Sequence, residues 1–261
     1  MDQEISAPRG ISLRKLTALQ AHFATILDSV LPPKYRIYGR PYFRDTLVPR
    51  YLAPNQTIYD VGGGANPFFA PQRKRQLGAR VVGLDISAEE LARAPNGSYD
   101  ETESVDLVTY RGRGDADLVI CQSVLEHVYD VAGAFRSFAS ILQPGGHLLV
   151  FVPNRNAFFA RVNRLLPEAL KRRILFALYP EKEKTSGFPV YYDRCTPRDF
   201  HAMAAKCGLE VEEEKHFFIC SYFFGVLPAY VIWRLWILIG ARLFGGQAAS
   251  TFCMVLRRPA A

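Results

Sequence analysis

The sequence predicts an α/β fold, a doubly wound domain built around a mostly parallel β-sheet. Short β-branched runs alternate with helical patterns between residues 57 and 152, which is the pattern of a parallel sheet with crossover helices. The chain has 261 residues and is 49% hydrophobic, which is enough for one large domain with insertions. We therefore expect a single domain over residues 1–261.

The elements of the first half follow from local patterns. Apolar residues recur at helical spacing over residues 13–31 until Pro32 and Pro33, which predicts an amphipathic helix in an N-terminal helical cover, residues 1–50. A core over residues 55–153 comes next, with a helix over 131–142 and the turn QPGG after it. Its strands are expected at 57–61, 80–85, 104–108, 117–121 and 146–152.

Two insertions interrupt the second half. Prolines recur among basic and apolar residues over 154–195, which predicts a mostly helical lid. A helix over 197–207, closed by Gly208, leads to a strand over 209–218, and a last strand covers 250–258. The segment between these strands, residues 219–248, is too apolar for an ordinary connection.

Composition limits the classes of function. Lys and Arg number 32 against 25 Asp and Glu, so the net charge of +7 points weakly to an anionic neighbour. The five cysteines form no CxxC pair, which argues against a zinc site and a disulfide framework. We expect no metal, and a reducing cytoplasm is the simplest compartment. The N-terminus lacks the apolar segment of a secretory signal.

The segment YDVGGGANPFF, residues 59–69, carries the most chemical information. A glycine-rich turn after a strand lets a ligand approach the backbone closely, although a tight turn without a ligand is the alternative. The dinucleotide pattern needs glycine where Pro67 stands, and a phosphate-binding P-loop needs a lysine that is missing here. The turn therefore favours a ligand that is not held by a phosphate.

Residues 60–66 resemble the first motif of class I S-adenosylmethionine-dependent methyltransferases, with Asn66 in place of the third glycine. The stretches VVGLDIS, SVDLV, DLVICQSVLEHV and LQPGGHLLVFVPN resemble the family in the same order. The resemblance implies a Rossmann-like seven-stranded sheet with an antiparallel last strand, S-adenosyl-L-methionine as cofactor, and methyl transfer. The cofactor-binding residues it implies are Asp60, Gly62, Gly63, Gly64, Asn66, Asp85, Ile86, Asp106, Leu107, Gln122 and Ser123.

Four of these positions have specific expected roles. Asp85 ends the second strand, where a carboxylate can accept hydrogen bonds from both ribose hydroxyls, and Ile86 would pack on the adenine. Asp106 resembles the family's acid beside the adenine amino group, with Leu107 adding a backbone or apolar contact. For Asp106, an acid in a turn that faces water is an equally good interpretation.

His127 is the candidate catalytic residue. An acceptor hydroxyl needs a general base, and the unperturbed pKa of histidine, about 6.5, lies near working pH. A structural histidine at the start of a helical turn is the alternative. Tyr191, Tyr192 and His201 are weaker candidates, because aromatic residues near a lid more often pack than react.

The two insertions indicate an apolar entrance to the active site and a lipophilic small-molecule or lipid-like acceptor. Residues 217–233 carry no charge and Arg234 and Arg242 follow, which is typical of peripheral contact with an anionic membrane. If 209–218 and 250–258 are neighbouring strands, the segment between them returns to the side where it started. A cap over the active site is the alternative for both insertions.

Nucleic acid is not favoured as a partner, because the basic residues alternate with aliphatic ones instead of forming a stacking platform. The function predicted is a cytoplasmic, membrane-associated methyltransferase. The alternative is a non-catalytic protein that keeps the methyltransferase fold for membrane or partner binding, and the departure at Asn66 keeps this alternative open.

Overall fold

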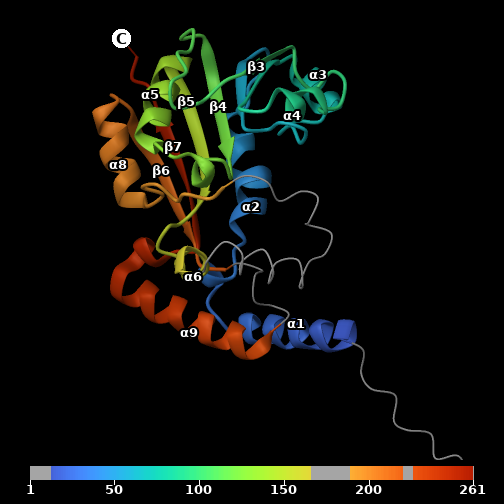
Figure 1. Cartoon of the computed structure of the whole chain (residues 1–261), viewed down its shortest axis with the longest axis vertical. Coiled ribbons are helices and arrows are strands. Elements are labelled where there is room, and N and C mark those ends of the chain that lie inside the picture. The colour runs from blue at the N-terminus through green and yellow to red at the C-terminus, as the bar shows by residue number, and fades with distance from the viewer. Residues whose placement is uncertain (1–12, 166–188, 220–225, 261) are drawn as a thin grey trace, which may run out of the picture.

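The computed structural model describes residues 13–165, 189–219 and 226–260, and these form a seven-stranded sheet with helices on both faces (Figure 1). The strand order is β3-β2-β1-β4-β5-β7-β6, and β7 runs antiparallel to both neighbours while the other pairs up to β5 are parallel. This confirms the predicted fold. The strands are β1 Thr57–Val61, β2 Arg80–Asp85, β3 Glu101–Ser104, β4 Ala116–Gln122, β5 Leu142–Pro153, β6 Glu210–Phe217 and β7 Thr251–Arg257.

The third strand was predicted in the wrong place. We expected it at 104–108, but β3 ends at Ser104 and a turn follows. The Asp106 carboxylate accepts the Val108 N–H at 2.9 Å, and the Leu107 carbonyl accepts the Ser137 hydroxyl at 2.6 Å. These backbone groups are therefore taken by side chains and do not enter the ladder. β3 itself is a polar edge strand, which is why its sequence carries no apolar signal.

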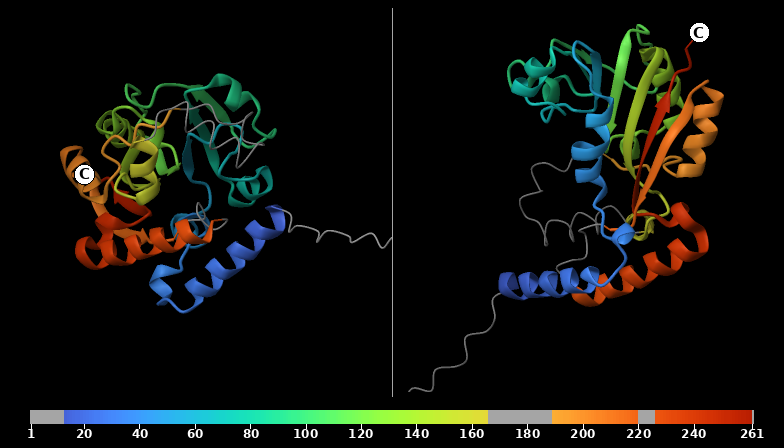
Figure 2. Two further views of the ribbon diagram at one scale, coloured as in Figure 1. Left: turned by 60° about the horizontal axis from the view of Figure 1, so that its bottom comes forward. Right: turned by 180° about the vertical axis from the view of Figure 1, so that it is seen from behind.

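Each face of the sheet has its own apolar core. The helices α5 (Val131–Ile141) and α8 (Pro197–Lys206) cover one face, where Phe135, Phe138 and Phe200 are buried. The other face is covered by residues 39–51, which include α2 (Gly39–Tyr42), and by α3 (Pro71–Leu77) (Figure 2). The short α4 (Ala88–Ala92) follows β2 and packs on β2 and β3. The sheet is thus wound on both sides, as expected.

The N-terminal cover divides into two parts. Residues 39–51 cover the sheet, but α1 (Leu13–Ser29) lies beside α9 (Leu227–Phe244) and packs on that helix (Figures 1 and 2). Arg234 of α9 ties the pair together, because its Nε lies 2.8 Å from Asp28 of α1 and both side chains are buried. The expectation that the first helix covers the domain is therefore wrong.

The insertions are described in part. α6 (Phe158–Leu165) begins the lid region and packs near α9, whereas residues 166–188 and 220–225 lie outside the described residues. The β6–β7 pairing matches Phe217 with Thr251, so the segment between them leaves the sheet and returns to it at the same end of the strands. This is the end of the sheet where β1, β2, β4 and β5 have their carboxyl ends. α9 is long and apolar enough to cross a membrane by length and composition, but the shared edge agrees with the expected return.

Candidate active site

The buried carboxylate of Asp60 holds the loop that follows β1. Asp60 accepts the Phe68 N–H at 2.7 Å, which ties the end of the turn back to β1, and it also accepts the Tyr99 hydroxyl at 3.3 Å. Burial raises the pKa of Asp60 to about 6, against the opposing effect of these hydrogen bonds. Pro67 does not begin the next helix, because α3 starts only at Pro71. Asp60 therefore shapes the turn predicted to bind the cofactor.

Two glycines of the turn have geometric reasons to be glycine. Gly62 has a φ of 72°, and a Cβ there would lie 2.2 Å from a methyl carbon of Val124. Gly64 has a φ of 46°, and its Cβ would lie 3.0 Å from Oδ2 of Asp85. The turn and Asp85 therefore lie side by side, as a shared binding site requires.

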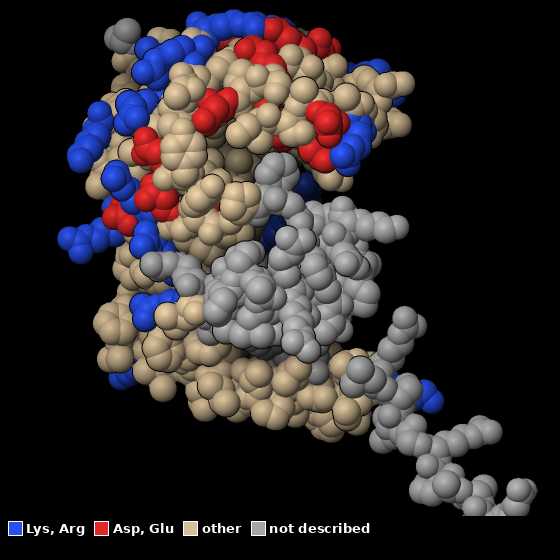
Figure 3. Space-filling model, viewed as in Figure 1, with Lys and Arg blue, Asp and Glu red and all other residues tan. Residues whose placement is uncertain are grey.

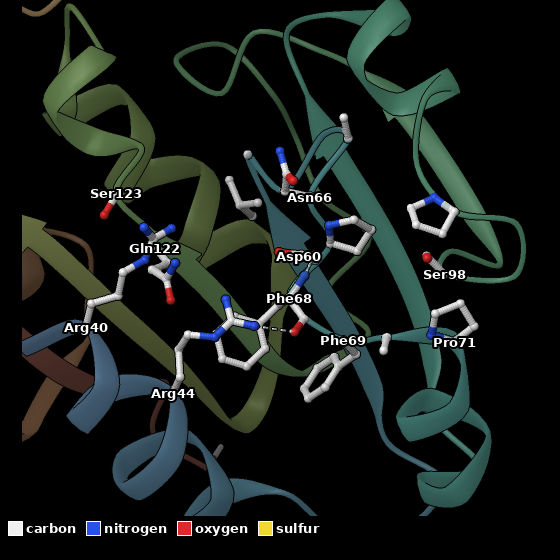
Figure 4. A pocket seen from close by; sticks show the side chains of 17 residues that line it. Arg40, Arg44, Asp60, Asn66, Phe68, Phe69, Pro71, Ser98, Gln122 and Ser123 are labelled. Carbon is white, nitrogen blue, oxygen red and sulfur yellow. Dashed lines mark hydrogen bonds between the residues drawn. The ribbon is translucent and has the colours of Figure 1, made fainter. Parts of the chain in front are cut away.

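A cavity of about 680 Å³ opens beside the turn (Figure 4). Its size suits a small-molecule ligand. Residues from the N-terminal helices, from the turn and its continuation, and from the end of β4 line it. The predicted site residues among them are Asp60, Gly62, Gly63, Asn66, Gln122 and Ser123. The structure therefore brings together two stretches that are far apart in the sequence.

Two arginines in this cavity were missed by the sequence analysis. Arg40 lies on α2 and Arg44 one helical turn later, and both point toward the end of β4 and the turn (Figure 4). Arg44 donates from Nη2 to the Phe68 carbonyl at 3.0 Å and lies 4.6 Å from the centroid of the Phe68 ring. Their spacing of four residues could have indicated one helical face, but nothing local connects them with the glycine turn.

The end of β4 faces Arg40. With its amide oxygen turned toward Arg40, Gln122 accepts from Nε and Nη2 of that residue, both at 3.1 Å. Ser123 follows with a φ of 57°, an unusual value for a residue other than glycine, and its N–H donates to the Phe151 carbonyl. Both residues lie at the carboxyl end of a parallel strand, where open α/β sheets bind ligands.

Five predicted residues lie outside the lining of this cavity, namely Gly64, which adjoins Asp85, and the residues Asp85, Ile86, Asp106 and Leu107. Asp85 is half-buried and accepts the Ser87 N–H at 2.9 Å; burial, and to a lesser extent the nearby Glu90, raises its pKa. Ile86 is exposed. Asp106 accepts the Tyr129 hydroxyl at 3.2 Å, and Leu107 is buried in the apolar core under α5. The Leu107 side chain therefore packs inward, and its backbone or apolar contact with a ligand stays a prediction.

The candidate base lies on the short helix Leu125–His127 that follows the end of β4. His127 Nδ1 is 2.9 Å from the Pro189 carbonyl oxygen, and His127 is not among the residues that line the cavity. This contact fits a structural histidine, and it would equally orient the ring of a general base, so the role of His127 stays a prediction. The neighbouring Glu126 is buried, and burial raises its pKa to about 8.

The weaker candidates for a base are held elsewhere. Tyr191 and Tyr192 donate their backbone N–H groups to the Glu126 carbonyl, which ties the segment after residue 188 to the end of β4. His201, on α8, contacts Glu214 of β6 through its Nε2 atom. None of the three lines the cavity.

Known proteins resemble this chain in both sequence and fold. Ubiquinone biosynthesis O-methyltransferase of Albidiferax ferrireducens is 33% identical over 117 residues, which cover 41% of this chain and 45% of that protein. The protein of the same name from Xanthomonas axonopodis pv. citri is 28% identical over 163 residues, which cover 60% of this chain and 63% of that protein. The chain thus spans less than two thirds of the length of these curated relatives.

Solved structures share the architecture at low identity. An S-adenosylmethionine-dependent methyltransferase from Mesorhizobium loti superposes with a TM-score of 0.55 at 20% identity, covering 83% of this chain and 98% of that one. One from Methanosarcina mazei gives 0.54 at 15% identity, with coverages of 83% and 98%. These likenesses support the fold.

A family model described as a methyltransferase domain matches residues 36–214, more than half of the chain. The match includes the N-terminal arginines, the glycine turn and the strand ends that form the cavity. It confirms the predicted resemblance to class I S-adenosylmethionine-dependent methyltransferases and, with it, the expected cofactor. The chain belongs to the methyltransferase domain family.

Proposed function

We propose that the protein transfers a methyl group from S-adenosylmethionine to a lipophilic small molecule or lipid-linked acceptor. The observation that carries this proposal is the meeting of the glycine turn with Asp85 at the ends of β1 and β2, beside a cavity with two arginines. S-adenosylmethionine would supply a methyl group already activated on its sulfonium sulfur. The protein's task is then to align the acceptor, and orientation can contribute about 7–11 kcal/mol.

The residues at the site fit this cofactor in two ways. Arg40 and Arg44 provide guanidinium groups in a cavity of the right size, and such groups bind carboxylates like that of a methionine moiety. Asp85 offers a carboxylate beside Gly64, suited to two ribose hydroxyls, and the exposed Ile86 next to it is available to a flat apolar base. The site contains no lysine-bearing phosphate loop, in keeping with a cofactor that has no phosphate.

A lipophilic acceptor is supported by the surroundings of the site. α6 and α9, which lie at the carboxyl edge of the sheet, expose apolar side chains such as Leu165 and Ile239. The relatives named ubiquinone biosynthesis O-methyltransferases suggest a quinone precursor as one such acceptor. We propose that a cytoplasmic enzyme in peripheral contact with a membrane meets its acceptor there. His127 remains our proposed general base, and the carbonyl contact of Nδ1 would orient its ring.

Calorimetry with S-adenosylmethionine tests cofactor binding. We expect the wild type to bind, and Asp85→Ala and Arg40→Ala each to weaken binding by about 10–100-fold, the loss of a charge-assisted hydrogen bond. Arg73→Ala, which removes an exposed arginine on α3 outside the cavity, is the matched control and should bind like the wild type. No binding by the wild type would refute the enzyme and leave the alternative of a non-catalytic protein with this fold.

Incubation with a donor labelled in the methyl group and a fractionated lipid extract tests the acceptor class. We expect label in the apolar fraction with the wild type and strongly reduced label with Asp85→Ala. Label only in water-soluble fractions would contradict a lipophilic acceptor while leaving methyl transfer intact.

A further inference from the structure

Apart from Arg234 and Arg242, α9 consists of apolar residues on all sides, yet the protein buries only one side of it. Tyr230, Trp233 and Ile237 face inward and form a small core with Ala24 of α1. A helix that is hydrophobic all round is ordinarily enclosed by protein or by lipid. The opposite side is exposed along the full length of the helix and consists of Val231, Ile232, Leu235, Trp236, Ile239, Leu243 and Phe244.

α1 repeats this arrangement beside α9. Its apolar stripe remains close to half exposed and comprises Leu16, Leu19, Phe23, Ile26 and Leu27. The two helices lie side by side below the sheet (Figures 1 and 2). We call the exposed apolar residues of α1 and α9 the helical platform. In Figure 3 the lower rim of the molecule, where these helices lie, carries few charged side chains.

The charges on these helices have one sign. α1, α6 and α9 together contain a single acidic residue, Asp28, and it is buried against Arg234 of α9. Within residues 13–165, 189–219 and 226–260, the exposed charges on these three helices and just after α1 are cations, namely Lys15, Lys34, Arg36, Arg161 and Arg242. Arg161 lies 5.8 Å from the centroid of the Trp236 ring, an aromatic–cation pair suited to a water–lipid interface. Arg234, which the sequence suggested as an interfacial cation, is instead turned inward.

We propose that the helical platform docks on an anionic lipid bilayer, with α1 and α9 lying in the plane of the interface. Apolar side chains whose exposed charged neighbours, in the part of the chain that the structure describes, are cations match anionic headgroups above acyl chains. A second copy of the chain fits less well, because its platform would bring cations against cations. The helices lie in the interface and do not span it, since β6 and β7 return the segment to one edge of the sheet.

Docking would also orient the catalytic end of the protein. The platform lies beyond the carboxyl ends of β1, β4 and β5, the same edge of the sheet on which the cavity opens. A groove of about 500 Å³ between α6 and α9, lined by Trp236, Ile239 and Leu243, adds apolar surface where acyl chains could enter. The inference goes beyond the proposed methyl transfer, because docking requires neither cofactor nor acceptor.

Tryptophan fluorescence of the full chain gives the first test. The chain has two tryptophans, of which Trp233 is fully buried and Trp236 is 46% exposed. On vesicles of equal parts phosphatidylglycerol and phosphatidylcholine, we expect the emission to shift to the blue and brominated acyl chains to quench it. Trp236→Phe should lose both effects because only the buried Trp233 remains. Quenching that survives in Trp236→Phe would overturn the proposed orientation.

Flotation with the same vesicles gives the second test. We expect the double variant Ile232→Glu/Ile239→Glu to reduce the bound fraction by about tenfold or more at low salt, because it puts acids on the platform. Both positions are exposed, at 62% and 59%, so the variant should fold with an unchanged melting temperature. Ala202→Glu/Ala205→Glu adds the same charge to exposed positions of α8 and should float like the wild type.

Three outcomes would overturn the proposal. The first is that the wild type stays in the bottom fraction with anionic vesicles. The second is that the platform variant and the α8 variant lose vesicle binding equally. The third is that the wild type sediments as a dimer and the platform variant as a monomer. Flotation without cofactor is independent of the calorimetric test, so the failure of one leaves the other intact.

Discussion

The substitution Gly62→Ala tests whether the glycine turn is shaped by its contact with the end of β4. The new methyl group would lie 2.2 Å from Cγ2 of Val124, well inside van der Waals contact, and the residue would keep a φ of 72°. Left-handed backbone costs about 1–2 kcal/mol for a residue with a Cβ, and overpacking adds about 1–3 kcal/mol. We therefore expect a total loss of about 2–5 kcal/mol in the free energy of unfolding.

Gly208→Ala separates these two contributions. Gly208 closes α8 with a φ of 69°, nearly the same as that of Gly62, but a Cβ there would have nothing within 4 Å. Only the backbone term of about 1–2 kcal/mol applies to it. Urea unfolding of the two variants measures the difference, and we expect Gly62→Ala to be less stable and to lose cofactor binding, which Gly208→Ala retains.

A double-mutant cycle with Val124→Ala completes the test. If the clash is the cause, the double variant should cost less than the sum of the two single variants by about 1–2 kcal/mol. Equal losses in Gly62→Ala and Gly208→Ala, together with additivity in the cycle, would refute the reasoning.

Two further predictions concern buried charges. Burial raises the pKa of Glu126 from 4.5 to about 8, so the folded protein holds this proton more tightly than the unfolded chain. The stability that Glu126 contributes is therefore complete below about pH 4.5 and is lost as the pH rises to about 8, by up to about 1.4 kcal/mol per pH unit. Glu126→Gln should flatten this part of the pH profile of the unfolding free energy. Glu210→Gln, at an exposed position, should leave the profile unchanged. Arg234→Met should cost about 3–5 kcal/mol in urea unfolding because Asp28 is left buried and unpaired, and adding Asp28→Leu should recover most of the loss; no recovery would contradict the pairing.

Most of the fold could be predicted because the sheet is largely buried. Strands covered on both faces, such as β1 and β4, must be nearly continuously apolar, and the helices between them show their own period, so local patterns identify both. β3 was misplaced because an edge strand has no such requirement. Its alternation of Glu101 and Glu103 is supported by ion pairs with Arg80 and Arg113, which no local pattern indicates.

The candidate site could be predicted where it consists of strand ends. Asp60, the glycines and Gln122 follow directly from β1 and β4, and parallel strands must bring their carboxyl ends to one edge. Arg40 and Arg44 could not be found in this way. They reach the cavity from a helix that is distant in the sequence, and the approach of that helix to the sheet is decided by packing.

The sequence alone therefore determined the α/β fold, the kind of cofactor turn and the presence of apolar surfaces that need a partner. Only the tertiary structure decided which partner each surface received. It placed α1 on α9 instead of on the sheet, turned Arg234 inward to Asp28, and left the second side of both helices uncovered. The physical reason is that hydrophobic periodicity records that a face avoids water, whereas its partner depends on non-local packing that periodicity does not encode.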